Sequence, residues 1–189
     1  MKFIVLSGIL LLAAITLCAQ PEGSSLLNLN QTRLEITQIH AFVLGGWALA
    51  NIIIGGYLTY KLEDGVAEAF HHMNAAWNLV NLGVAWAILH SANQSDPIAY
   101  DLGFSIMKHF QSQKLMMLNI GLDVTYTLAG LLLFEHSKNA RKMNYLLKGF
   151  GISLMMQGAF LFLLDITFYS IYSSYNNDLW KILKHYQLY

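Results

Sequence analysis

Four long stretches of this chain are almost free of charged residues, and they constrain the fold more than any other feature. Residues 36–60 and 69–95 contain no Asp, Glu, Lys or Arg, residues 115–134 contain only Asp123, and residues 149–177 contain only Asp165. The helices of soluble proteins usually carry a charged face. A membrane span needs about 20 apolar residues, so the pattern predicts an all-α, integral membrane four-helix bundle with spans at about residues 39–60, 72–92, 114–134 and 149–172.

The composition of the whole chain agrees with a membrane protein. Only 12% of its 189 residues are charged and 56% are hydrophobic, whereas a soluble domain carries roughly 25% charged residues. Eleven basic and eleven acidic residues cancel, so the charge gives no reason to expect nucleic acid as a partner. Cys18 is the only cysteine, which excludes a disulfide framework, a cysteine zinc site and an iron–sulfur cluster. The predicted partner is the lipid bilayer.

The N-terminal segment has the layout of a secretory signal peptide. Lys2 is followed by an apolar run from Phe3 to Leu17 and then by small residues. Residues 1–20 are therefore predicted to be a signal peptide or, alternatively, an uncleaved anchor. Lipidation at Cys18 is a third interpretation, which Leu17 immediately before the cysteine disfavours. A signal peptide or an anchor would place the chain after Pro21 outside the cytoplasm.

The charged connections predict the orientation of the spans. The loop from Glu135 to Lys142 is short and basic, and the positive-inside rule places such a loop in the cytoplasm. Four spans with an external mature N-terminus require the same placement. The predicted location is the cytoplasmic (inner) membrane, which the resemblance described below implies to be bacterial, with a multi-pass domain over residues 21–177 and both mature termini external. Residues 178–189, which mix aromatic and basic side chains, are predicted to be an interfacial tail.

Polar side chains recur inside every predicted span at intervals of three, four or eight residues. Such spacing places them on one face of each helix, and lipid cannot satisfy their hydrogen bonds. We therefore expect the polar faces to point at one another inside the bundle. The predicted polar-core residues, which are also the candidate ligand or ion site, are Asn51, His71, Asn74, Asn78, Asn81, Asn119, Asp123, Tyr126, Gln157 and Asp165.

The two carboxyl groups are the most unusual members of this set. No Lys or Arg lies within the four charge-poor stretches, so Asp123 and Asp165 have no obvious intramembrane counter-cation. Each is expected to be protonated or hydrogen-bonded, and both are expected in the outer half of the membrane, near one another. The primary interpretation is a non-enzymatic bundle with a structural Asn/Asp network. The alternatives are a small ion- or proton-coupled transporter or channel component and, third, a cofactor-dependent membrane enzyme.

The histidines and glycines lead to two further predictions. His40 and His71 share the inward faces but lie at opposite ends of the membrane, and His72 and His90 face away from the asparagines, so neither a metal nor a cofactor is predicted. Gly45 and Gly56 belong to a small-residue face opposite Asn51, which is a candidate surface for a homo-oligomer or a membrane-protein partner. The tryptophans, including Trp47, are expected to be partly interfacial anchors.

Several motifs resemble a family of small bacterial membrane proteins described only as a domain of unknown function. They include the Trp-Ala-Leu-Ala-Asn string of residues 47–51 and the Met-Asn-x-x-Trp-Asn-x-x-Asn string of residues 73–81. The likeness continues through residues 118–126 and 149–151 and ends with residues 157–165. His72 stands where the family pattern has Gln. The resemblance implies a four-span helical protein with an N-terminal signal sequence, and it implies no activity.

Overall fold

The computed structural model describes residues 25–187 as five helices and no strand. The helices are α2 (Leu26–Lys61), α3 (Gly65–Asn93), α4 (Leu102–Ser137), α5 (Asn144–Ser174) and α6 (Asn176–Gln187). The predicted signal peptide lies outside the described residues. Three helices begin at a side-chain cap, in which Ser25, Asp64 and Asp101 accept hydrogen bonds from backbone N–H groups of the first turn. The all-α prediction is confirmed for the described part of the chain.

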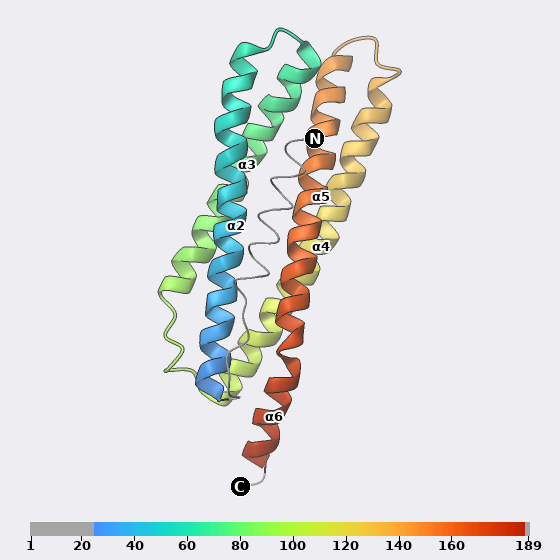
Figure 1. The fold of residues 1–189 in the computed structure, drawn as a ribbon. Coiled ribbons are helices and arrows are strands. Elements are labelled where there is room, and N and C mark those ends of the chain that lie inside the picture. The colour runs from blue at the N-terminus through green and yellow to red at the C-terminus, as the bar shows by residue number, and fades with distance from the viewer. Residues whose placement is uncertain (1–24, 188–189) are drawn as a thin grey trace.

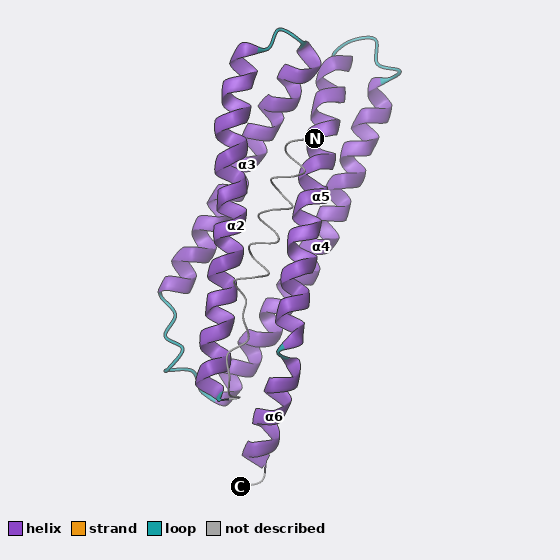
Figure 2. Ribbon diagram, viewed as in Figure 1, coloured by secondary structure: helices purple, strands orange, loops and turns teal. Residues whose placement is uncertain are grey.

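Helices α2 to α5 form two antiparallel hairpins that lie side by side (Figure 1). The short connections of both hairpins lie at one end of the bundle, and the α3–α4 connection and α6 lie at the other end (Figure 2). The most extensive contacts are between α4 and α5, between α2 and α3, and between α3 and α5. Helices α3 and α5 are therefore the central pair, with α2 packed on the first and α4 on the second.

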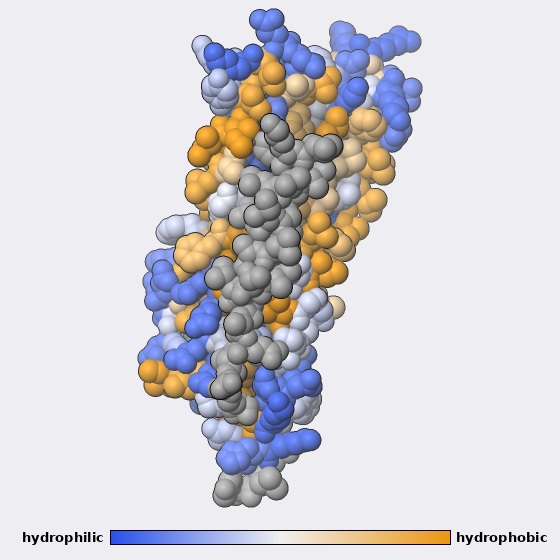
Figure 3. Space-filling model, viewed as in Figure 1, coloured by the Kyte–Doolittle hydropathy of each residue, from blue (hydrophilic) through white to orange (hydrophobic). Residues whose placement is uncertain are grey.

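Three segments are long and apolar enough to cross a membrane, namely α2, α4 and the segment from Asn144 to Tyr186 that contains α5. Helix α3 does not reach the same level of hydropathy, because its asparagines and histidines lie among its apolar residues. Figure 3 shows a band of hydrophobic residues between hydrophilic residues at the two ends. Large apolar side chains in this band point outward, and Phe42, Ile53 and Leu132 are 65%, 68% and 70% exposed.

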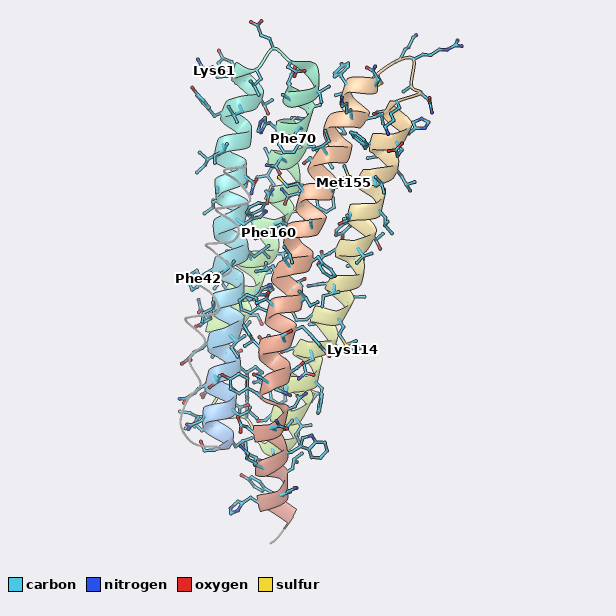
Figure 4. All side chains as sticks on the ribbon, turned by 45° about the vertical axis from the view of Figure 1, so that its right-hand side comes forward. Phe42, Lys61, Phe70, Lys114, Met155 and Phe160 are labelled. Atoms are coloured by element: carbon cyan, nitrogen blue, oxygen red, sulfur yellow. The ribbon has the colours of Figure 1, made fainter. Side chains whose placement is uncertain are left out.

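The apolar core runs along the inner face of α5 and continues into α6. Phe160 stacks on Trp47 of α2 with ring centroids 3.8 Å apart, and Figure 4 shows Phe160 among the helices, whereas Phe42 lies on the outside. Trp47 is 2% exposed, so its predicted role as an interfacial anchor is wrong. In α6, Leu179 and Ile182 join the same core and Trp180 stays exposed.

Glycines allow α4 and α5 to approach closely. A Cβ atom added to Gly151 would lie 2.6 Å from the backbone oxygen of Gly130, and one added to Gly130 would lie 2.7 Å from the backbone oxygen of Gly151. Gly158 likewise lies against the backbone of Asp123. Small residues at a membrane helix interface permit this backbone contact. The carboxyl-bearing part of α4 is thereby held against α5.

Replacing Gly151 with Ala should therefore destabilise the bundle by about 1–3 kcal/mol, because the new methyl group overlaps backbone atoms that cannot move independently. The matched control is Gly121→Ala on α4, where an added Cβ meets nothing within 4 Å among the described residues. This control should leave stability unchanged or raise it, since Ala favours helix over Gly. Denaturant titration of both purified variants in detergent tests the difference, and equal unfolding midpoints would contradict it.

Candidate functional site

Side-chain amides join three helices in the interior of the bundle. Gln157 of α5 accepts a hydrogen bond of 3.0 Å from the indole N–H of Trp47 and donates one to Asn74 Oδ1 of α3. Asn74 in turn donates to Asn51 Oδ1 of α2 at 2.6 Å, and Asn51 donates to the backbone oxygen of Trp47 at 2.8 Å. The four side chains form a closed ring of donors and acceptors, so the polar faces of α2, α3 and α5 do point at one another.

The polar face of α3 extends this ring along the helix. Asn78 is fully buried and donates to the backbone oxygen of Asn74 at 2.8 Å, and Asn81 donates to Asn78 Oδ1 at 3.2 Å. The spacing of three and four residues thus brings Asn74, Asn78 and Asn81 into one connected line, as the sequence predicted. These side chains carry no charge, and their arrangement can orient helices but cannot exchange protons with solvent.

A buried acid–imidazole pair lies farther along α2 and α5. His40 Nε2 is 3.0 Å from Asp165 Oδ1, and the two residues are 3% and 5% exposed. The ring of Phe168 packs against the imidazole with centroids 4.7 Å apart. Asp165 therefore has an imidazole partner inside the bundle, which corrects the expectation that neither carboxyl group has a basic partner. The partner is a histidine, whereas the expectation considered only Lys and Arg.

The second carboxyl group, Asp123 of α4, has a different environment. Its side chain is 3% exposed, and Oδ2 has no hydrogen-bond partner among the described residues. Its backbone lies against α5, the helix that carries Asp165, since a Cβ atom added to Gly158 would be 2.7 Å from the backbone oxygen of Asp123. Burying an unpaired polar atom is costly, and Asp123 is the carboxyl group among the described residues that has a buried oxygen without a partner. His40, Asp165 and Asp123 together form a group of three titratable side chains from three helices.

The remaining predicted site residues lie outside the closed ring. Asn119 is half-buried and has no side-chain hydrogen bond among the described residues. Tyr126 is half-buried and meets the edge of Trp77, with centroids 4.9 Å apart. His71 lies near the hairpin end, and its Nδ1 is buried without a hydrogen-bond partner among residues 25–187. None of these three touches the amide ring through a hydrogen bond.

A second polar cluster, which the sequence analysis did not identify, lies beyond the predicted spans at the α6 end. His109 Nε2 and Gln113 Nε2 each lie 2.7 Å from Asn176 Oδ1 at the α5–α6 junction. Burial lowers the pKa of His109, its hydrogen bond to Asn176 Oδ1 opposes this effect, and the positive charge of Arg33 adds to it. The environment of His109 thus favours the neutral imidazole. The cluster fixes α6 to α4.

The predicted partner surface on α2 is only partly free. Gly45 lies against Ala85 of α3, where an added Cβ would be 3.4 Å from the alanine methyl group, whereas Gly56 meets nothing within 4 Å among the described residues. The close approach on α2 occurs at Gly55, where an added Cβ would lie 2.9 Å from the backbone oxygen of His71. The partner surface at Gly45 and Gly56 stays a prediction, and the close contact with α3 inside the bundle is made by Gly55.

The chain belongs to a family of unknown function (DUF6992), whose sequence pattern matches residues 43–166. The matched region contains the whole amide ring together with Asp123 and Asp165. No curated protein and no solved structure matches the chain. The family assignment agrees with the expectation of a domain of unknown function, and it carries no activity. In residues 25–187, no group of three or more His, Cys, Asp or Glu side chains has the arrangement needed to hold a metal ion.

Replacing Asn74 with Ala should lower stability by about 1–3 kcal/mol, because it leaves Asn51 Oδ1 and Gln157 Nε2 buried without their partners. Asn119→Ala is the matched control, since it removes the same side chain from a predicted span without breaking a hydrogen bond of the ring. Thermal unfolding of the two variants in detergent gives the comparison. A smaller loss for Asn74→Ala than for Asn119→Ala would contradict a structural role of the ring.

Proposed function

We propose that this member of the family is a non-enzymatic, four-span protein of the bacterial cytoplasmic membrane that acts as a structural bundle. The observation that carries the proposal is the closed ring of Trp47, Asn51, Asn74 and Gln157. Each of these four side chains donates one hydrogen bond to another residue of the ring. Such a ring fixes one packing of α2, α3 and α5. All four residues are buried, so the amide oxygens and nitrogens that take part in the ring are engaged within the protein and turned away from solvent.

The position of α3 supports its assignment as a fourth span. It packs antiparallel to α2 and against α5, both of which lie in segments apolar enough to cross a membrane. Residues 69–93 of α3 contain no Asp, Glu, Lys or Arg, and the buried Asn74, Asn78 and Asn81 point inward. Their polarity lowers the hydropathy of α3 without exposing polar groups to lipid. The same composition is unfavourable for a helix that faces water.

The charges of the hairpin end support the predicted orientation. The connections after α2 and α4 lie at the same end of the bundle (Figure 1). The α4–α5 connection and the residues next to it contain four basic side chains, namely Lys138, Arg141, Lys142 and Lys148. The positive-inside rule favours the cytoplasm for this end. The opposite end, with the α3–α4 connection and α6, is then external.

Cysteines placed at the two ends test this topology. In a Cys18→Ser background, Ala99→Cys lies in the exposed α3–α4 connection and Asn139→Cys lies in the exposed α4–α5 connection. A membrane-impermeant maleimide should label Ala99→Cys in intact cells whose outer membrane has been opened, and Asn139→Cys only after the inner membrane is permeabilised. The reverse pattern would overturn the orientation, and labelling of both in intact cells would overturn the four-span topology.

A second candidate function is a proton-coupled transporter or channel component. The specific observation that favours it is the buried pair of His40 and Asp165, with Asp123 beside it as an unsatisfied second carboxyl group. Ionisable side chains at membrane depth often belong to proton or ion pathways. One imidazole can neutralise only one carboxylate. The net charge of His40, Asp165 and Asp123 taken together therefore changes when Asp123 gains or loses a proton.

Proton flux into liposomes decides between the two candidates. Purified chain is reconstituted with an internal pH-sensitive dye, and a pH step is applied. If the group conducts protons, Asp165→Asn and Asp123→Asn should reduce the flux to that of protein-free liposomes, while the control Asp178→Asn in α6 keeps it. Wild-type flux equal to that of protein-free liposomes would eliminate the second candidate and leave the structural bundle.

A further inference from the structure

A groove of about 470 Å³ opens where α3 and α4 separate, next to the α3–α4 connection. Helix α3 packs on α2 and α5 and makes little contact with α4, so this side of the bundle is left open. One face of α3 and one face of α4 line the groove, and the beginning of α2 forms its base. The lining residues that matter here are Arg33, Val84, Ile88, Tyr100, Lys108 and Leu115.

The lining changes from apolar to cationic along the helix axes. Val84 and Ile88 lie inside the predicted span of α3, and Leu115 lies at the start of the predicted span of α4. Arg33 and Lys108 each lie six residues outside the predicted span of their helix, since these spans begin at residues 39 and 114. The groove therefore crosses the predicted membrane boundary, with its apolar part at acyl-chain depth and its cations at headgroup depth.

The cations of the groove have no anionic partner within the described chain. Arg33 is 8% exposed, donates 3.2 Å to the backbone oxygen of Ser105 and lies 5.4 Å from the ring centroid of Tyr100. Lys108 Nζ lies 5.2 Å from the ring centroid of Phe104. No Asp or Glu among residues 25–187 forms an ion pair with either of them, and no acidic residue lines the groove.

A buried guanidinium group without a counter-ion is costly, and one hydrogen bond to Ser105 leaves most of its five N–H donors available. Burial lowers the pKa of Arg33 from its ordinary value, which reflects this loss of hydration. The shape and charge of the groove thus suit an anion that brings its own apolar chain. A free phosphate ion would neutralise the cations and leave the apolar half of the groove empty.

We propose that this groove binds one anionic phospholipid from the adjacent leaflet, with the phosphate between Arg33 and Lys108 and the upper part of an acyl chain along Val84, Ile88 and Leu115. The volume accommodates a headgroup and the first part of a chain, and the remainder of the lipid stays in the bilayer. The inference rests on the membrane insertion proposed above. It adds a ligand class and a site that the interior polar network does not provide.

Native mass spectrometry of the full chain in neutral detergent tests the site. Dioleoylphosphatidylglycerol is added in competition with dioleoylphosphatidylcholine, and inorganic phosphate is added to a separate sample. Lys108→Gln removes one cation from a partly exposed position and should weaken phosphatidylglycerol binding about tenfold, as expected for one charge-assisted hydrogen bond. Ala87→Phe fills the groove without changing its charge and should weaken binding as well.

The matched control is Lys114→Gln, which removes an exposed lysine of the same helix that does not line the groove and that Figure 4 labels on α4. Its phosphatidylglycerol binding should equal that of the wild type. Three outcomes would overturn the proposal. The wild type could bind the two lipids equally, Lys108→Gln and Lys114→Gln could lose phosphatidylglycerol binding to the same extent, or phosphate alone could displace the bound lipid. Carbonate extraction of membranes distinguishes failure of the groove proposal from failure of the proposed membrane insertion. Release of the chain by carbonate would refute membrane insertion. Retention of the chain together with equal binding of the two lipids would refute only the lipid site in the groove.

Discussion

The cost of burying polar groups without hydrogen bonds is the constraint on which the arrangement of the helices depends. A buried amide must be satisfied by protein or by enclosed water. In this bundle Asn74 of α3 meets that requirement by accepting from Gln157 of α5 and donating to Asn51 of α2. A rotation of any of the three helices would break at least one of these bonds. Each such bond is worth only about 0.6 kcal/mol on average in membrane proteins, so the ring contributes more to the choice of packing than to total stability.

The acid–imidazole pair follows from the same constraint but has a different chemical consequence. His40 Nε2 and Asp165 Oδ1 lie 3.0 Å apart, so each of these two side chains has a partner in the interior. Asp123 has no such partner and lies against α5 through the close contact at Gly158. The structural proposal therefore rests on the uncharged amide ring, and its proton-handling alternative rests on these three ionisable side chains in an adjacent part of the same bundle.

Periodicity predicted the polar faces well because it depends only on the geometry of each helix. Asn51, Asn74 and Gln157 lie on different helices, and their inward faces could be read from spacing alone. The pairing of His40 with Asp165 depends on the relative register of α2 and α5. Two other helices separate α2 from α5 in the sequence, so no local pattern fixes that register. The cluster of His109 and Asn176 was missed for another reason. It lies outside the predicted spans, where polar residues are ordinary.

The central position of α3 connects the interior network with the open side of the bundle. Because its asparagines face α2 and α5, α3 has little surface left with which to contact α4. Helix α4 is held instead by α5, through the paired glycines Gly130 and Gly151 and through Gly158. The gap between α3 and α4 is thus a consequence of where the hydrogen bonds lie. The close contacts of α3 with Gly55 of α2 and Gly149 of α5 hold it in the same orientation, so the polar ring and the small residues together keep α3 apart from α4.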